Sequence, residues 1–419
     1  MALNNFIGDF HIHSKYSRAT SSQMELEHLD AAAKEKGIDV LGTGDFTHPQ
    51  WFEELKEKLE PAEEGLFKLK GSKQGTRFIL TSEISCIYSK KEKVRKIHII
   101  VFSPNLQTVE KINARLALIG NLKADGRPIL GLDAKELAKI VLGVCPECLV
   151  IPAHLMTPWF SLFGSRSGFD SLNECFEEYA KYIYAGETGL SADPAMLWRL
   201  PDGRRLTLVS NSDAHSLAKL GREANVFKGE MSYRAIREAL IDKKQNNLLY
   251  TIEFFPEEGK YHYDGHRNCG VRLSPSETKK CGGICPVCGR PLTVGVLSRI
   301  EELADKPEGF RPEDAIPFKR IIPLKEIIGE AFNVGATTKE VEKEYNALIE
   351  KFGSELEILL GTPIADLKSA TFPEVAEAIH RVREGKVHVS PGYDGVYGKI
   401  KIFSKEIQKE KFSGQKSLF

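Results

Sequence analysis

Ionisable side chains recur in this sequence at the points where apolar, strand-like runs end. The stretch GDFHIHSKYS places His11 and His13 two residues apart directly after such a run. Because side chains alternate between the two faces of a strand, both imidazoles project to the same side. NSDAH repeats this spacing with Asp213 and His215. A single pair of this kind also fits surface residues on a sheet edge, so the rest of the chain must decide between the two interpretations.

Further candidate ligands follow other strand-like runs. From residue 1 to about 255 the patterns of strand and helix alternate, and repeated βα units imply parallel strands, wound as an open sheet or closed as a barrel. The carboxyl ends of parallel strands share one rim, so residues scattered along the chain would converge there. Imidazole and carboxylate ligands suit Zn, Mn or Fe. The candidate metal ligands are His11, His13, Asp45, Glu83, His98, His154, Glu187, Asp213 and His215.

The elements that position these residues follow from periodicity and capping. SQMELEHLDAAAKEKG predicts a helix with Ser22 as N-cap, Glu25 as its capping-box partner and Gly37 as its stop. DAKELAKIVLGV and SYRAIREALI have the same helical periodicity, whereas RFILTSEIS, KIHIIVFSP and CLVIPAH are rich in β-formers.

The length and the charge of the chain limit which classes of protein it can belong to. The 419 residues are enough for two or three domains. The 58 basic and 58 acidic residues balance, so any DNA contact needs a local basic surface. No apolar run approaches the length of about 20 residues that spans a bilayer, and MALNNFIGDF lacks a secretory signal pattern, so we expect a cytoplasmic protein.

A second site is predicted in YHYDGHRNCGVRLSPSETKKCGGICPVCGRPLTVGV. His266 and Cys269 form one short pair and Cys285 and Cys288 form another, at the spacing of a zinc ribbon. A closed site with four ligands is structural, not catalytic. Cys281 is the rival of His266 as fourth ligand, and an accidental cysteine cluster is the alternative without metal.

The residue pattern of the sequence changes beyond about residue 300. A connector punctuated by proline leads to TTKEVEKEYNALIEKFGSELEILLG and TFPEVAEAIHRVREGKV, which have helical periodicity. In VSPGYDGVYGKIKIF, Lys399 and Lys401 alternate on one strand face and could touch DNA. The expected domains are therefore a catalytic domain (1–255), a zinc ribbon (256–300), a mostly helical DNA-binding domain (301–410) and a flexible tail (411–419).

The motifs DFHIH, TGDFTH, TSEIS, KIHII, IPAH, AGETG and NSDAH resemble, in this order, those of the polymerase and histidinol phosphatase (PHP) family. The resemblance implies a distorted (β/α)7 barrel that holds up to three metal ions and hydrolyses phosphoesters, with Glu83 as a bridging carboxylate. GDFTH lacks the histidine that many relatives have directly after Asp45, which leaves His48 as its possible substitute. Asp193 is either a ligand or proton-transfer group, or the N-cap of a helix that begins with proline. Glu83, Asp193 and Asp213 are the candidate catalytic residues.

The tail GQKSLF is similar to the short Gln-x-x-Leu-Phe motif by which archaeal repair proteins bind the sliding clamp. Gln415 would hydrogen-bond beside the clamp pocket, while Leu418 and Phe419 would be apolar anchors. The alternative is a tail that binds no partner, because short motifs also occur by chance.

The whole chain, from the PHP-type region through the ribbon and helical region to the tail, resembles the archaeal endonuclease Q family. The resemblance implies cleavage of DNA 5′ to uracil, hypoxanthine, xanthine or an abasic site, leaving 3′-hydroxyl and 5′-phosphate ends. It implies Zn²⁺ in the ribbon and the barrel, with Mg²⁺ or Mn²⁺ for activity. In TPWFSLFGSRSG, Trp159 or Phe160 could stack on a base and Arg166 could contact a phosphate. The alternatives are a small-molecule phosphatase of the histidinol phosphate or nucleotide type, and a non-catalytic DNA-binding adaptor.

Overall fold

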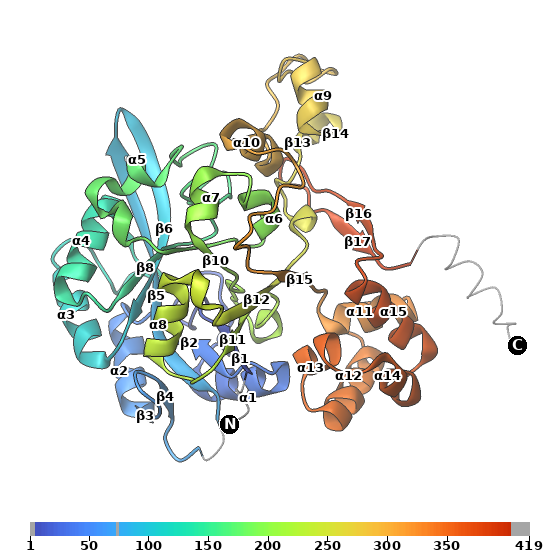
Figure 1. Cartoon of the computed structure of the whole chain (residues 1–419), viewed down its shortest axis with the longest axis horizontal. Coiled ribbons are helices and arrows are strands. Elements are labelled where there is room, and N and C mark those ends of the chain that lie inside the picture. Colours follow the sequence, from blue (N-terminus) through green and yellow to red (C-terminus); the bar gives the residue numbers. More distant parts are fainter. Residues whose placement is uncertain (1–4, 73–74, 404–419) are drawn as a thin grey trace, which may run out of the picture.

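The structure is a computed structural model that describes residues 5–72 and 75–403. Figure 1 shows an α/β body from blue to green, a gold extension that carries α9 and β14, and a group of orange and red helices beside the body. None of the described helices combines the length and apolar character needed to cross a lipid bilayer.

Short strands form the centre of the α/β body. β1 (Asn5–Asp9), β2 (Val40–Gly42) and β5 (Arg77–Lys90) pair in parallel, as do β9 (Ala185–Glu187) and β10 (Thr207–Val209). Antiparallel strands complete the sheet: β6 (Lys93–Ser103) pairs with β5 and with β8 (Leu149–Pro152), and β11 (Ala224–Lys228) pairs with β1 and with β12 (Leu248–Glu253). Three short strands extend this sheet: β4 (Phe67–Leu69) pairs with the start of β5, β3 (Leu59–Pro61) pairs with β4, and β7 (Ile129–Leu130) pairs with the middle of β5.

The α/β fold with a distorted barrel is confirmed, but the strands are not all parallel. β5 and β6 form a long hairpin because only two residues join them. Both of these residues, Lys91 (φ 52°) and Glu92 (φ 61°), adopt the left-handed conformation that a tight hairpin turn requires. This hairpin replaces one βα unit and brings Glu83 and His98 onto adjacent strands.

Helices cover the outside of the sheet. They are α1 (Leu26–Lys36), α2 (Pro49–Lys58), α3 (Leu106–Leu116), α4 (Ala134–Val144), α5 (Leu172–Phe176), α6 (Pro194–Leu197), α7 (Pro201–Arg205) and α8 (Tyr233–Ile241). Gly37 (φ 85°) ends α1 as predicted, but the capping box was wrong, since Glu25 is the N-cap and makes no side-chain capping bond. Met24 is fully buried, which holds the preceding residues in a turn instead of a first helical turn.

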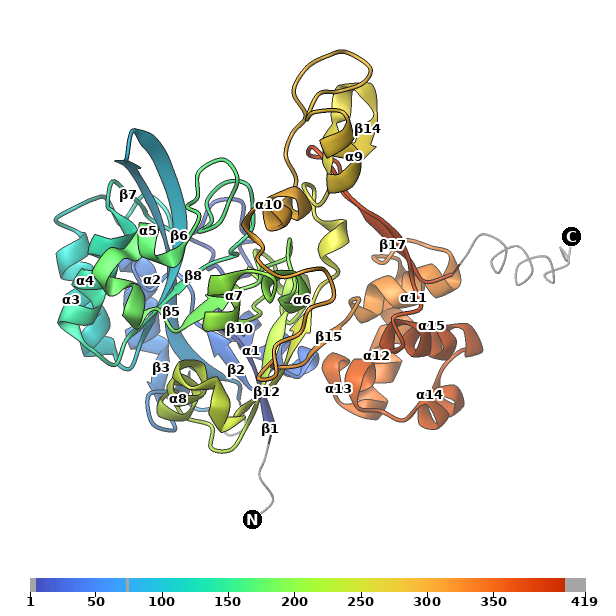
Figure 2. The same cartoon turned by 45° about the horizontal axis from the view of Figure 1, so that its top comes forward.

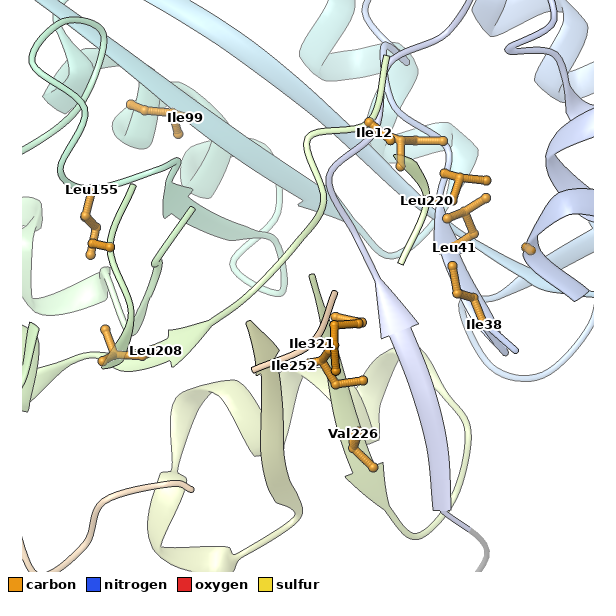
Figure 3. Close-up of a cluster of buried hydrophobic side chains, with 14 of the residues drawn as sticks. Ile12, Ile38, Leu41, Ile99, Leu155, Leu208, Leu220, Val226, Ile252 and Ile321 are labelled. Atoms are coloured by element: carbon orange, nitrogen blue, oxygen red, sulfur yellow. The ribbon is translucent and has the colours of Figure 1, made fainter. Parts of the chain in front are cut away.

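Buried aliphatic side chains fix the ends of the strands that carry the candidate ligands. Ile12 is fully buried and lies near Leu41 and Leu220 in the cluster of Figure 3. Since side chains alternate along an extended segment, burial of Ile12 turns His11 and His13 away from this cluster. The core therefore sets which way the two imidazoles point.

The rest of the chain extends from the body and returns to it (Figure 2). The extension contains β13 (Asp264–His266), β14 (Val271–Leu273), α9 (Pro275–Lys280) and α10 (Val296–Leu303), after which β15 (Phe318–Arg320) pairs with β12. The helical part contains α11 (Leu324–Phe332), α12 (Lys339–Phe352), α13 (Glu355–Leu360), α14 (Ile364–Ala370) and α15 (Pro373–Arg383). The hairpin of β16 (His388–Ser390) and β17 (Lys399–Lys401) then lies back against the start of the extension, through a bridge from Tyr393 to Tyr263.

Candidate active site

Four of the predicted ligands meet at one end of the barrel. His11 and His13 follow β1, Glu83 lies within β5, and Asp213 follows β10 with a φ of 47°. One potential ligand atom from each lies within 4.8 Å of the other three. His13 Nε2 is 3.1 Å from Asp213 Oδ1 and 3.3 Å from Glu83 Oε2. Residues from distant parts of the sequence thus form one group of nitrogen and oxygen ligands.

A second group lies on the other side of Glu83. His98 Nδ1 is 2.7 Å and His154 Nε2 is 3.1 Å from Glu83 Oε1, and the two imidazole nitrogens are 3.3 Å apart. His98 comes from β6, whereas His154 follows β8 with a φ of 28°. Glu83 therefore presents Oε2 to the first group and Oε1 to the second, as a carboxylate that bridges two metal ions would.

His11 carries a direct sign that the first group fits a metal ion. Its Nε2 is buried and makes no hydrogen bond, although Glu83 Oε2 and Asp213 Oδ1 lie only 3.5 and 3.6 Å away. A buried nitrogen without a partner is costly in a protein interior, and a cation between it and the two carboxylates would remove that cost. The donor set of imidazole and carboxylate groups fits Zn²⁺ or Mn²⁺.

Asp45 and Glu187, both expected as ligands, lie outside the two groups. The Nδ1 of His11 donates to Glu187 and the Nδ1 of His13 donates to Asp45, each at 3.0 Å. A carboxylate in this position fixes the ring orientation and leaves the opposite nitrogen free for a metal. We therefore assign both acids the task of orienting the ligand histidines, a role that their places at strand ends alone did not distinguish from ligation.

The carboxylates and imidazoles of the two groups shift one another's pKa values. Burial raises the pKa of Glu83, but His98, Arg127 and His11 more than compensate and hold the pKa well below its usual range. Burial lowers the pKa of His98 to about 4, which outweighs the opposing effect of Glu83. Burial opposes protonation of His11, His13 and His154, but the surrounding carboxylates more than compensate and raise the pKa of each of these imidazoles. Glu83 is therefore ionised, and a metal ion bound beside it would displace protons from these histidines.

Three other expected residues take different positions. His215 donates from Nδ1 to the carbonyl oxygen of Asp213 and its ring lies 4.4 Å from that of His13, outside both groups. His48 is the N-cap residue of α2 and stacks on Tyr16. Asp193 accepts a hydrogen bond from the backbone of Met196, so the N-cap alternative describes it, and its other oxygen pairs with Arg320.

A pocket of about 560 Å³ opens over both groups, lined by His98, His154 and Asp213 among others. Trp159 and Phe160 line it, and Trp159 makes an edge contact with Tyr261 at the start of the extension, with ring centroids 5.4 Å apart. Arg166 is exposed and is not among the lining residues.

Arg127 is a site residue that the sequence analysis missed. Its Nη1 lies 3.1 Å from Glu83 Oε2, and it lines the pocket together with Arg18. The segment around it, ADGRPIL, is not strand-like, so the rule of strand ends could not find it. The available signal was Gly126: a Cβ there would lie 2.2 Å from Asp45 Oδ2, so this loop must approach the site closely.

The four predicted ribbon ligands also come together. His266, Cys269, Cys285 and Cys288 each offer one atom within 4.8 Å of the other three, in a group of their own far along the chain. Cys281 lies outside this group, and its thiol donates to the carbonyl oxygen of Thr278. The geometry therefore favours His266 over Cys281 and fits a tetrahedral structural site.

The remaining predicted binding residues are peripheral. Lys399 and Lys401 are exposed on β17, on the same face of the strand. Gln415, Leu418 and Phe419 lie outside the described residues.

Two solved structures resemble the whole chain. The lesion-specific endonuclease PfuEndoQ from Pyrococcus furiosus matches with a TM-score of 0.85 and 32% sequence identity, over 98% of both chains. Endonuclease Q in complex with a 27-mer duplex substrate that has an abasic lesion at the active site matches with a TM-score of 0.83 and 33% identity, over 97% of this chain and 98% of the other.

Two proteins are similar to the chain in sequence. Protein YqxK of Bacillus subtilis (strain 168) is 30% identical over 379 residues, which are 89% of this chain and 91% of YqxK. Protein MJ0043 of Methanocaldococcus jannaschii is 36% identical over 266 residues, or 61% of this chain, but these make up only 32% of MJ0043. The family described as the MJ0043 C-terminal domain matches residues 323–386.

The α/β fold and the two ligand groups that share Glu83 are those of a metal-dependent phosphoesterase. Within this class the chain belongs to the endonuclease Q family, since its similarity to endonuclease Q extends over nearly the full length of both chains.

Proposed function

We propose that this protein is a DNA repair endonuclease that hydrolyses the phosphodiester bond 5′ to uracil, hypoxanthine, xanthine or an abasic site, leaving 3′-hydroxyl and 5′-phosphate ends. The observation that carries the proposal is Glu83, whose two oxygens face two ligand groups below an open pocket. The abasic duplex bound by the related endonuclease Q supports DNA as the substrate. Release of the phosphate from histidinol phosphate without DNA cleavage would instead favour a small-molecule phosphatase.

The residues of the chain have distinct tasks in this reaction. Divalent ions held by the two groups would lower the pKa of water and offset the charge of the phosphodiester. Glu187 and Asp45 orient His11 and His13 from behind, so that the ligand nitrogens need no rearrangement. Asp213 is the one acid of the first group that is partly exposed, with 28% of its side chain accessible, so it faces the incoming phosphate.

Two arginines provide the positive charge for binding the scissile strand. Arg127 lines the pocket beside Glu83, and the more exposed Arg18 also lines it and pairs with Asp125 at 3.3 Å. Guanidinium groups match the geometry of phosphate oxygens and stay charged at any physiological pH. Arg127 is therefore our candidate for contact with the phosphate that is cut, and Arg18 for contact with its neighbour.

The pocket is of a size to hold an extruded base. Its volume of about 560 Å³ lies within the usual range for small-ligand sites, and Trp159, Phe160 and Tyr261 offer aromatic surfaces for stacking. Extrusion of a nucleotide costs least when its pairing is already weakened or its base is missing. This supports a preference for damaged sites over intact DNA.

The ribbon supplies the local basic surface that a chain without net charge needs for DNA contact. We propose a structural Zn²⁺ on His266, Cys269, Cys285 and Cys288. The cations exposed on this extension are Arg267, Arg272, Lys279, Lys280 and Arg290. Together with Lys399 and Lys401 of the hairpin that lies against it, they would hold the duplex by its phosphates.

A cleavage assay tests the proposal. A duplex with one uracil or one hypoxanthine, incubated with Mg²⁺ or Mn²⁺, should be cut on the 5′ side of the lesion, and Glu83→Gln should abolish cutting. Glu60→Gln is a matched control, because Glu60 is a partly exposed acid on β3 that pairs with Lys68. Equal cleavage of undamaged DNA would eliminate the lesion-specific function. Binding without cleavage across several divalent metals would support the non-catalytic adaptor.

We also propose that the terminal residues Gln415, Leu418 and Phe419 bind a DNA sliding clamp. The support is the motif in the sequence alone. A pull-down with purified clamp should recover the full chain but not a chain that ends at residue 414. Equal recovery of both would contradict clamp binding through this motif.

A further inference from the structure

Leu118 is the most exposed large apolar side chain among the described residues, with 88% of its surface accessible. It lies in the turn directly after α3, where the backbone N–H groups of Leu118 and Ile119 donate to the carbonyl oxygens of Arg115 and Leu116. Ile119 is itself 39% exposed. Single exposed apolar residues are ordinary on protein surfaces, so the neighbourhood of this turn decides whether it has a task.

The turn packs against the rim of the active-site pocket. Gly120 approaches β7 so closely that a Cβ on it would lie 2.6 Å from a methyl carbon of Leu130. The neighbouring residue of β7, Ile129, is 56% exposed and lines the pocket. The turn of Leu118 and Ile119 is therefore joined through Gly120 to β7, whose Ile129 lines the opening to the candidate metal ligands, and we call these three exposed apolar residues the apolar rim.

Cations flank the turn of Leu118 and Ile119 in the sequence. Arg115 and Lys123 are exposed on either side of the turn, and the same segment continues to Arg127 inside the pocket. A surface for another folded protein would be expected to have fewer charges at its centre. An apolar tip flanked by cations is instead the arrangement by which proteins insert a side chain into a stack of base pairs and hold the adjacent phosphates.

The turn is also held firmly. The side chain of Asn113 in α3 donates from Nδ2 to the backbone carbonyl oxygen of Phe46. The backbone carbonyl oxygen of Asn113 accepts the N–H of Ala117. Leu122 is buried after the turn. A tip fixed on both sides loses little conformational entropy when it enters a tight space.

Building on the proposed function, we propose that Leu118 inserts between the base pairs next to the extruded nucleotide. Its apolar side chain fills the gap that the nucleotide leaves in the duplex, and Ile119 and Ile129 cover the edge of the opened base step. This occupation of the gap stabilises the extruded state while the lesion lies in the pocket.

The test compares duplex with single-stranded substrate, because a single strand has no stack to open. Leu118→Ala should cut a uracil-containing duplex at least about tenfold more slowly, in kcat/KM, and a uracil-containing single strand at nearly the wild-type rate. Leu118→Met is the matched control, since it keeps an apolar side chain of similar volume and should retain most of the duplex activity.

A direct readout of extrusion complements the kinetics. The duplex for this measurement carries 2-aminopurine opposite an abasic site, and both proteins carry Glu83→Gln to prevent cutting. Binding of the protein that keeps Leu118 should change the 2-aminopurine fluorescence. Binding of the protein that also carries Leu118→Ala should change it much less. Equal loss of duplex and single-strand cleavage in Leu118→Ala, or no loss in either, would overturn the insertion. Absence of any lesion cleavage by the unaltered protein would instead overturn the proposed function itself.

Discussion

The role of Glu187 behind His11 predicts a specific effect of the substitution Glu187→Gln. Both oxygens of this buried carboxylate lie 3.0 Å from His11 Nδ1, and they also accept hydrogen bonds from the backbone of His154 and the amide of Asn211 at 2.9 Å. The carboxylate forces the proton of His11 onto Nδ1, so Nε2 is free to bind a metal. A glutamine can instead donate its NH₂ to Nδ1, which moves the proton to Nε2 and blocks the ligand atom.

The expected size of the effect follows from the loss of the carboxylate that orients His11. Removing a partner that orients a metal ligand weakens metal binding or activity by about 10- to 100-fold, which is about 1.4–2.7 kcal/mol. Titration of the metal-free protein with Mn²⁺ measures this directly, and kcat/KM on a lesion duplex should fall in the same range when Mn²⁺ is limiting. High Mn²⁺ should restore part of the activity, since a weakened site can still be filled.

A control separates this effect from loss of folding. Asp30 is a buried acid that accepts the N–H of Thr76 at 2.8 Å and pairs with Lys34, away from both ligand groups. Asp30→Asn should lower the free energy of unfolding without changing Mn²⁺ affinity. The assignment of Glu187 would be refuted if Glu187→Gln bound Mn²⁺ within about twofold of the unaltered protein while remaining folded.

Three further predictions concern separate parts of the molecule. Cys288→Ser should lose the zinc of the ribbon and keep the metals of the barrel, whereas Cys281→Ser should keep both, as elemental analysis would show; unchanged zinc in Cys288→Ser would exclude the ribbon site. Arg127→Ala should lower kcat/KM on lesion DNA by about 100-fold, mainly through kcat, because charge stabilisation of the reacting phosphate is lost; a change below about threefold would remove Arg127 from the reaction. Burial raises the pKa of Glu253 from 4.5 to about 8, so the proton is bound more tightly in the folded state. The stability that this provides is complete below pH 4.5 and is lost as the pH rises through about 8, at up to about 1.4 kcal/mol per pH unit, so Glu253→Gln should flatten the decline seen by urea unfolding between pH 5 and 8. An identical slope in the variant would contradict this linkage.

The sequence predicted the convergence of the site because strand ends share one rim. His11, His13 and Asp213 come together there, as the alternation of strand faces and the βα order implied. The prediction that Glu83 and His98 also follow strand ends was wrong, because they lie in the middle of β5 and β6, and the long hairpin of these strands brings them to the same site. Position at a strand end, however, does not say whether a carboxylate faces the metal or the back of a histidine. That choice depends on side-chain packing. For this reason Glu187 was expected to bind a metal, whereas the structure places it against Nδ1 of His11.

Short sequence patterns predicted the local structure least well where burial of side chains in the tertiary fold favours another conformation. The capping box of Ser22 and Glu25 was a plausible helix start, but burial of Met24 places the first turn later. Arg127 was missed because it lies in an irregular loop, whose path is set by the close approach at Gly126. The spacing of the ribbon ligands was a stronger signal, since two short pairs must fold toward each other to bind one ion.

The bridging position of Glu83 is the central claim, and anomalous X-ray diffraction from a crystal grown with Mn²⁺ tests it most directly. We expect one anomalous peak between Glu83 Oε2 and the group of His11, His13 and Asp213, and another between Glu83 Oε1 and the group of His98 and His154. A map with no peak beside either oxygen of Glu83, from protein that cuts lesion DNA with Mn²⁺, would contradict it.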